Sequence, residues 1–232
     1  MSAEARPLSV VPRWLWAALV LALGAQLGAR ALGPPASLWD AEMPPAPRAE
    51  ALRIASFGER EAAARMTALY LQSFDVQGYE PAVVAGWLGA ALELEPRGAY
   101  PLFLAARIYA EVPGAARTRA MLDFIHREFL RDPNRRWPWL AHAALLAKHR
   151  LRDLPLARRY AADLQRLVTA EEVPMWVTQM EIFILEDMNE LEAAKVMLGG
   201  LLASGRIRDP GEARFLKQRL DELEARARPS VK

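Results

Sequence analysis

The sequence contains no cysteine, and this absence excludes disulfide bonds, thiolate metal sites and cysteine nucleophiles. It has only three histidines, His126, His142 and His149, and it lacks HExxH or any similar spacing of metal ligands. Alternation of apolar and polar residues with a period of two, which marks β-strands, is missing as well. Alanine, leucine, arginine and glutamate, all good helix formers, dominate instead. We therefore expect an all-α protein that holds neither a metal nor another cofactor.

Lysine is also scarce, with four copies among 30 basic residues, so arginine carries nearly all of the positive charge. The formal net charge is only +2, and no sustained basic helix or mixture of aromatic and basic residues points to nucleic acid. Hydrophobic residues make up 53% of the chain and charged residues 25%, as in folded proteins. We therefore expect a folded chain with no nucleic-acid partner.

The longest apolar run lies near the N-terminus, between Arg13 and Arg30, and its 16 residues include Gln26 as the one strongly polar position. A membrane span takes about 20 residues, so we expect the helix to extend to Leu32 with Arg30 reaching to the interface. This predicts a transmembrane signal anchor at 14–32, after a cytoplasmic segment at 1–13. The chain would then be a single-pass protein of the inner (cytoplasmic) membrane, with its other residues in the periplasm. A cleaved signal peptide, which would release a soluble periplasmic binding module, is the alternative.

Residues 33–47 contain five prolines and are predicted to form a stiff linker. Beyond them, proline, glycine and polar caps divide the chain into helices. Ser56 and Asn189 are expected to cap the helices that follow them, and Asp209 to cap a last, amphipathic helix within a capping segment at 209–232. We expect the helices at about 48–56, 58–74, 81–94, 98–111, 114–131, 136–150, 154–168, 174–187, 189–203 and 210–227.

Small residues recur early in the second helix of successive helix pairs. They lie at Val84 or Ala85, Ala120, Ala157 and Ala193, with spacings of 35 to 37 residues. Two helices in a period of this length are typical of an α-solenoid built from antiparallel hairpins.

Three stretches carry a more specific pattern. Leu102, Ala105-Ala106 and Tyr109 follow Pro96 as a bulky residue, two small residues and an aromatic residue. The stretch from Asp153 to Ala157 with Ala161 and Leu164, and the stretch from Asn189 to Ala193 with Met197, fit the second half of the same unit. In these positions the chain resembles the tetratricopeptide repeat (TPR) family. The resemblance implies TPR-like hairpins over 48–208 and a concave surface that binds segments of other proteins.

The charges of neighbouring hairpins have opposite sign. Ten basic residues lie between Arg127 and Arg166 against four acidic ones, whereas Glu171 to Glu192 contains seven acidic residues and no basic one. One interpretation is a bipolar groove that selects a partner by its charge. The other is a solvated surface on which adjacent hairpins attract each other. Arginine and tryptophan are frequent interface anchors, so the candidate partner-binding residues are Arg135, Arg136, Trp137, Trp139, Arg150, Arg152, Arg159, Glu181, Glu186 and Asp187.

Together these features predict a membrane-anchored TPR-like scaffold or adaptor that mediates protein–protein interactions in an envelope assembly. Secretion, pilus, polysaccharide-export and cytochrome-maturation machineries are not distinguished, and neither is the oligomeric state. An envelope enzyme with a helical body is the alternative, with Glu181, Glu186 or Asp187 as its acid. Such an acid needs a cleft and usually a second domain, so we do not expect an enzyme.

Overall fold

The computed structural model describes residues 12–32, 43–75, 78–170, 172–205, 207 and 209–227. The chain divides into two compact units, Met1–Ala41 and Glu42–Lys232. Helices are the only regular secondary structure among the described residues, as expected for an all-α protein. The predicted segment 1–13, apart from its last two residues, and positions 33–42 of the predicted linker lie outside the described residues.

The first unit contains one helix, α1 (Arg13–Leu32). None of the helices in the described part of the chain has both the length and the apolar character needed to cross a membrane. The predicted transmembrane anchor at 14–32 is therefore wrong, and so is the inner-membrane, single-pass localisation. Only 16 residues separate Arg13 from Arg30. They give about 24 Å of helix, against about 30 Å of hydrocarbon in a bilayer.

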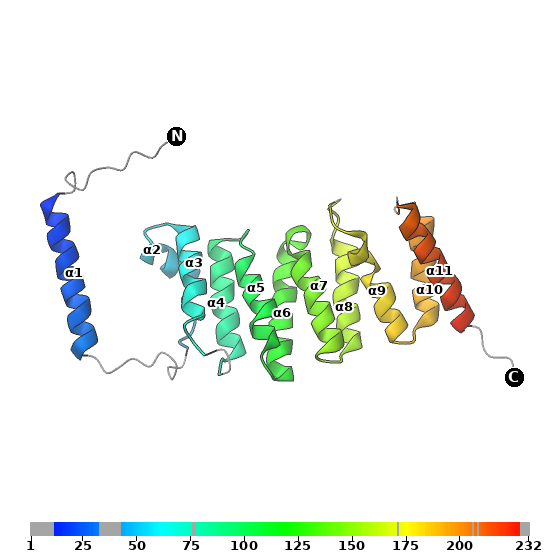
Figure 1. Ribbon diagram of the computed structural model, residues 1–232, viewed down its shortest axis with the longest axis horizontal. Helices are drawn as coiled ribbons and strands as arrows, with labels where there is room; N and C mark the ends of the chain where they lie inside the picture. Colours follow the sequence, from blue (N-terminus) through cyan, green and yellow to red (C-terminus); the bar gives the residue numbers. More distant parts are fainter. Residues whose placement is uncertain are drawn as a thin grey trace. The chain divides into compact units, whose positions relative to one another are not determined.

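The second unit is a row of helices in which successive elements lie side by side in chain order (Figure 1). Four hairpins, α3–α4, α5–α6, α7–α8 and α9–α10, follow the short helix α2, and α11 packs on α10. The array is solenoid-like. Its elements are α2 (Ala49–Ala55), α3 (Arg60–Leu71), α4 (Pro81–Leu94), α5 (Tyr100–Arg107), the 3₁₀ turn η2 (Tyr109–Glu111), α6 (Ala115–Arg131), α7 (Pro133–His149), α8 (Leu154–Leu167), α9 (Met175–Asp187), α10 (Leu191–Ala203) and α11 (Pro210–Ala227).

Prolines and aspartates start most of these helices. Pro81 and Pro133 occupy the first turns of α4 and α7, where a missing N–H costs nothing. Asp153 caps α8 by accepting a 2.9 Å hydrogen bond from the Leu156 N–H, and Asp209 accepts one of 2.9 Å from the Glu212 N–H at the start of α11. The predicted cap at Asp209 is thus confirmed. Helix α7 begins three residues earlier than predicted, because Pro133 occupies its first turn.

The predicted caps at Ser56 and Asn189 are wrong, because both residues belong to the ends of the preceding helices. Asn189 has φ +60°, and the N–H groups of Asn189 and Glu190 return to Glu186 and Leu185 at 3.0 and 2.9 Å. This is a Schellman ending of α9. Ser56 likewise ends α2. Asparagine and serine have small polar side chains that are found both before the first turn and after the last turn of helices. The sequence alone therefore did not show whether Ser56 and Asn189 begin one helix or end another.

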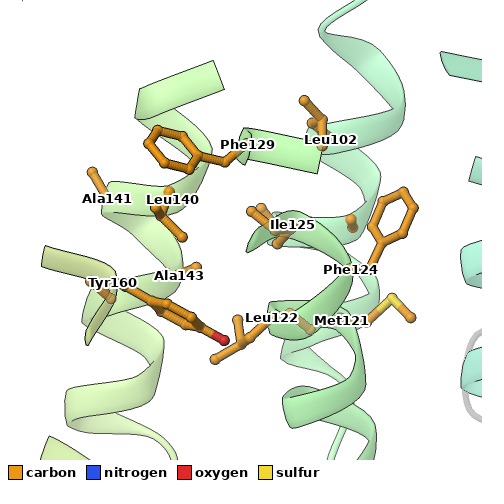
Figure 2. Packing of buried hydrophobic residues seen from close by; sticks show 14 of the residues in the cluster. Leu102, Met121, Leu122, Phe124, Ile125, Phe129, Leu140, Ala141, Ala143 and Tyr160 are labelled. Carbon is orange, nitrogen blue, oxygen red and sulfur yellow. The ribbon is translucent and has the colours of Figure 1, made fainter. Parts of the chain in front are cut away.

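One apolar cluster is continuous across the helices from α3 to α9. Figure 2 shows Ile125 and Phe129 of α6 between Leu102 of α5 and Leu140 of α7, with Tyr160 of α8 beyond. This main cluster includes residues from α3 to α9. A second cluster joins α9, α10 and α11 and consists of Ile182, Leu185, Ala194, Leu198, Leu201, Leu216 and Leu223. The amphipathic α11 therefore packs its apolar residues against α10.

Candidate protein-binding surface

Arg136 is a structural residue, although the sequence suggested a partner-binding one. Only 5% of its surface is exposed. One guanidinium nitrogen, Nη1, donates to the carboxylate and the backbone oxygen of buried Glu128, at 2.7 and 2.8 Å, and Nη2 donates to the Pro96 oxygen at 3.1 Å. The side chain thereby joins the α4–α5 connection, the end of α6 and the start of α7. It is not accessible to a partner in this conformation.

The acidic candidates are paired with neighbouring helices. Asp187 forms an ion pair with Lys148 of α7, and Glu181 accepts a hydrogen bond of 3.4 Å from Arg158 of α8. Buried Glu186 pairs with Arg219 of α11. The described geometry thus uses the opposite charges of adjacent hairpins to hold them together, which supports the second of the two interpretations given above.

The four remaining arginine candidates lie on the surface but do not form a single site. Arg135 pairs with Asp132 at 3.0 Å, and Arg150 donates to the Glu111 backbone oxygen at 2.6 Å. Arg159 lies over the ring of Tyr160, 5.5 Å from its centre. Arg152 is exposed in the loop before α8, with φ +54°. Each therefore occupies its own local environment.

Aromatic side chains form a row across the first helices of three successive hairpins. Tyr100 and Phe103 of α5 stack with ring centres 5.9 Å apart, and Phe103 meets Trp139 of α7 edge to face at 6.3 Å. On the other side of α7, Trp137 meets Trp176 of α9 edge to face at 5.8 Å. We call these five residues the aromatic row.

Three of the five side chains in the aromatic row are exposed to solvent. Tyr100 is 45% exposed, Phe103 38% and Trp176 48%, whereas Trp137 and Trp139 pack partly against the core. The sequence reasoning found both α7 tryptophans and missed the other three residues. A usable signal existed, because Tyr100, Trp137 and Trp176 follow one another at 37 and 39 residues, which is close to the period of the hairpins.

Beside the row lies a polar group between α5 and α7. The ring of His142 is 3.5 Å from Arg107 and 3.9 Å from Glu111, and Arg107 lies 3.6 Å from the same carboxylate. Burial, reinforced by the nearby Arg107 charge, lowers the pKa of His142 below its ordinary value. The imidazole is therefore neutral at pH 7. The described residues contain no group of three or more metal-ligating side chains that could hold an ion.

Protein-family models, curated proteins and solved structures offer no match to this chain. The resemblance to tetratricopeptide repeats therefore stays a prediction from the residues.

Proposed function

We propose that the protein is a helical-repeat scaffold that binds a segment of another protein through the aromatic row. The observation that carries this proposal is a set of five aromatic side chains on α5, α7 and α9, three of them exposed by more than a third. Ring contacts join α5 to α7 through Phe103 and Trp139, and α7 to α9 through Trp137 and Trp176. Large aromatic side chains supply much of the binding energy in protein interfaces. The TPR-like pattern of the sequence supports the same class of function.

The dimensions of the row limit the size of the partner segment. Packed helices lie about 10 Å apart, so a row over three of them is about 20 Å long. A helix of about 13 residues or an extended strand of about six covers that distance. We therefore infer a short linear segment with spaced apolar side chains as the bound element.

The proposal is tested with a photo-crosslinking amino acid, benzoylphenylalanine, placed at Phe103 or Trp176 in the native cell. Phe215 of α11 is the matched control, because it is an aromatic residue with 55% exposure outside the row. The same partner is expected from both row positions and not from position 215. With the purified partner, Trp176→Ala should then weaken binding by at least about tenfold and Phe215→Ala should not. Identical crosslinks from all three positions would contradict the proposal.

A further inference from the structure

Apart from the aromatic row, the surface of the second unit contains a hollow on a different set of helices. It is a groove of about 810 Å³ between the segment 46–50, the second helices α4 and α6, and the start of α3. The aromatic row, by contrast, lies on the first helices α5, α7 and α9. We call this hollow the arginine groove, because its lining includes five arginines: Arg48, Arg53, Arg60, Arg127 and Arg131.

Two glycines of α4 shape the groove. A Cβ at Gly86 would lie 3.2 Å from the Ala46 Cβ, so its absence lets the segment before α2 approach α4 closely. Trp87 holds that segment in place by donating a 2.8 Å hydrogen bond from Nε1 to the Pro44 oxygen. A Cβ at Gly89 would meet only the ring of Phe124, at 3.9 Å. Space above Gly89 is therefore available to a ligand.

The charges of the groove are unbalanced. Three glutamates line it against the five arginines, and two of these glutamates have basic partners. Glu50 binds Arg53 at 2.5 Å, and Glu128 binds both Arg136 and Arg131 at 2.7 and 2.8 Å. The side chains of Arg48 and Arg127 are exposed and form no ion pair or hydrogen bond with the described residues. The groove thus holds positive charge that the described chain does not neutralise.

The arrangement fits carboxylates better than a phosphate. Both long helices of the groove end in it, since Leu94 and Arg131 are the last residues of α4 and α6 and both belong to its lining. The partial negative charge of these helix ends disfavours any anion close to them, and it disfavours a compact dianion more than a single carboxylate. The arginines come from separate segments of the chain, and each guanidinium can bind one carboxylate in a bidentate manner. Single negative charges spaced along a chain therefore complement them.

We propose that the arginine groove binds a short acidic peptide segment, whose carboxylates pair with Arg48 and Arg127 while its backbone lies over Gly89. The floor of the groove runs from Ala85 to Leu94 along α4. At 1.5 Å per residue it is about 14 Å long, which accommodates two to three helical turns or about four extended residues. The groove and the aromatic row occupy different helices, so either proposal can fail without the other.

The test uses a fluorescein-labelled peptide of glutamate and alanine, its glutamine analogue as a control, and fluorescence anisotropy. The glutamate peptide should bind at least about tenfold more tightly than the analogue, and its binding should weaken between about 50 mM and about 300 mM salt. Equal binding of the two peptides would overturn the proposal. Displacement of the peptide by equimolar inorganic phosphate would also overturn it, because the groove would then be a phosphate site.

Two pairs of variants locate the binding. Arg127→Glu should weaken it at least about tenfold, whereas Arg214→Glu on α11 makes the same change of charge outside the groove and should not. Gly89→Leu should block the floor, and Gly200→Leu on α10, where a Cβ would have no neighbour within 4 Å, is its control. All four positions are at least partly exposed, so circular dichroism should report folded proteins. Equal affinity within either pair would place the peptide elsewhere and overturn the proposal.

Discussion

At the scale of single residues, burial decides which charged side chains are structural. Arg136 and Glu128 are 5% and 4% exposed and bind each other. A buried ion pair adds little to the free energy of unfolding compared with apolar residues of the same shape. Loss of one partner, however, leaves the other as a buried, uncompensated charge. The Arg136–Glu128 pair therefore determines how α6 and α7 fit together more than it raises stability.

Arg136→Met is expected to lower the free energy of unfolding by about 3 kcal/mol or more, because it leaves the Glu128 carboxylate buried with Arg131 as its one remaining partner. Urea denaturation followed by circular dichroism measures the change. The double variant with Glu128→Met should recover a large part of the loss, since no buried charge remains. A single variant as stable as the unmodified protein would refute the structural role of Arg136.

His142 predicts a dependence of stability on pH. The pKa of His142 is lowered in the folded protein, by burial first and by Arg107 second, so the unfolded chain binds a proton more readily. The associated stability is fully present above the ordinary histidine pKa of 6.5 and is lost as the pH falls below it. His142→Gln should reduce the fall in stability between pH 8 and pH 5.5, measured by urea denaturation. His149→Gln, at an exposed position, is the control, and an equal effect of both variants would contradict the assignment.

At the scale of helices, the sequence predicted well where each helix lies and predicted poorly which residues cap its ends. Prolines and apolar periodicity placed nearly every helix boundary within three residues, because a proline such as Pro81 or Pro210 suits one end of a helix only. Asn189 could cap α10 or end α9, and its left-handed backbone depends on how those two helices pack. The predicted helix at 98–111 instead tightens into a 3₁₀ turn after Ile108.

The difference between a true and an apparent cap can be measured. Asp209→Ala should cost about 1 kcal/mol of stability, because the carboxylate accepts hydrogen bonds from the N–H groups of Gly211 and Glu212. Ser56→Ala should change stability by less than about 0.5 kcal/mol, because the Ser56 hydroxyl only donates to the Arg53 backbone oxygen. Thermal unfolding of both variants tests the pair. A larger loss for Ser56→Ala would restore the predicted cap at Ser56.

The candidate surface was harder to predict than the helices. Periodicity marks Trp137 and Trp139 as aromatic residues near a helix start, but ring contacts with Phe103 and Trp176 depend on how neighbouring hairpins are offset. The roles of charged residues also depend on how neighbouring helices pack. Glu186 and Asp187 are adjacent in sequence, yet Glu186 is buried against α11 and Asp187 is exposed beside α7. Composition therefore identified the residue types of a candidate interface, and packing decided their roles.

At the scale of the whole described array, most of the buried apolar residues belong to two of its three clusters, and the third is a small one of Ala63, Ala64 and Leu94. The main one includes residues from α3 to α9, and the second joins α9 to α11. Repeat arrays of this kind depend on contacts between neighbours, so the loss of one contact weakens one end before the other.

Leu216→Ala tests this division, because Leu216 is 1% exposed in the second cluster. The substitution should cost about 2–5 kcal/mol locally. Hydrogen exchange followed by mass spectrometry should then show faster exchange in α10 and α11 and unchanged protection in α6. Equal loss of protection in α6 would mean that the array unfolds as one cooperative unit.

The hydrogen bonds between neighbouring hairpins have a consequence for synthesis on the ribosome. Among the described residues, the hydrogen bond with the largest sequence separation joins Trp87 to Pro44, 43 residues apart. At about 5–20 residues per second, a chain segment of that length emerges in about 2–9 s. Each hairpin therefore meets its bonding partners soon after it leaves the exit tunnel. The array can be completed from its N-terminal end while the C-terminal helices are still being translated.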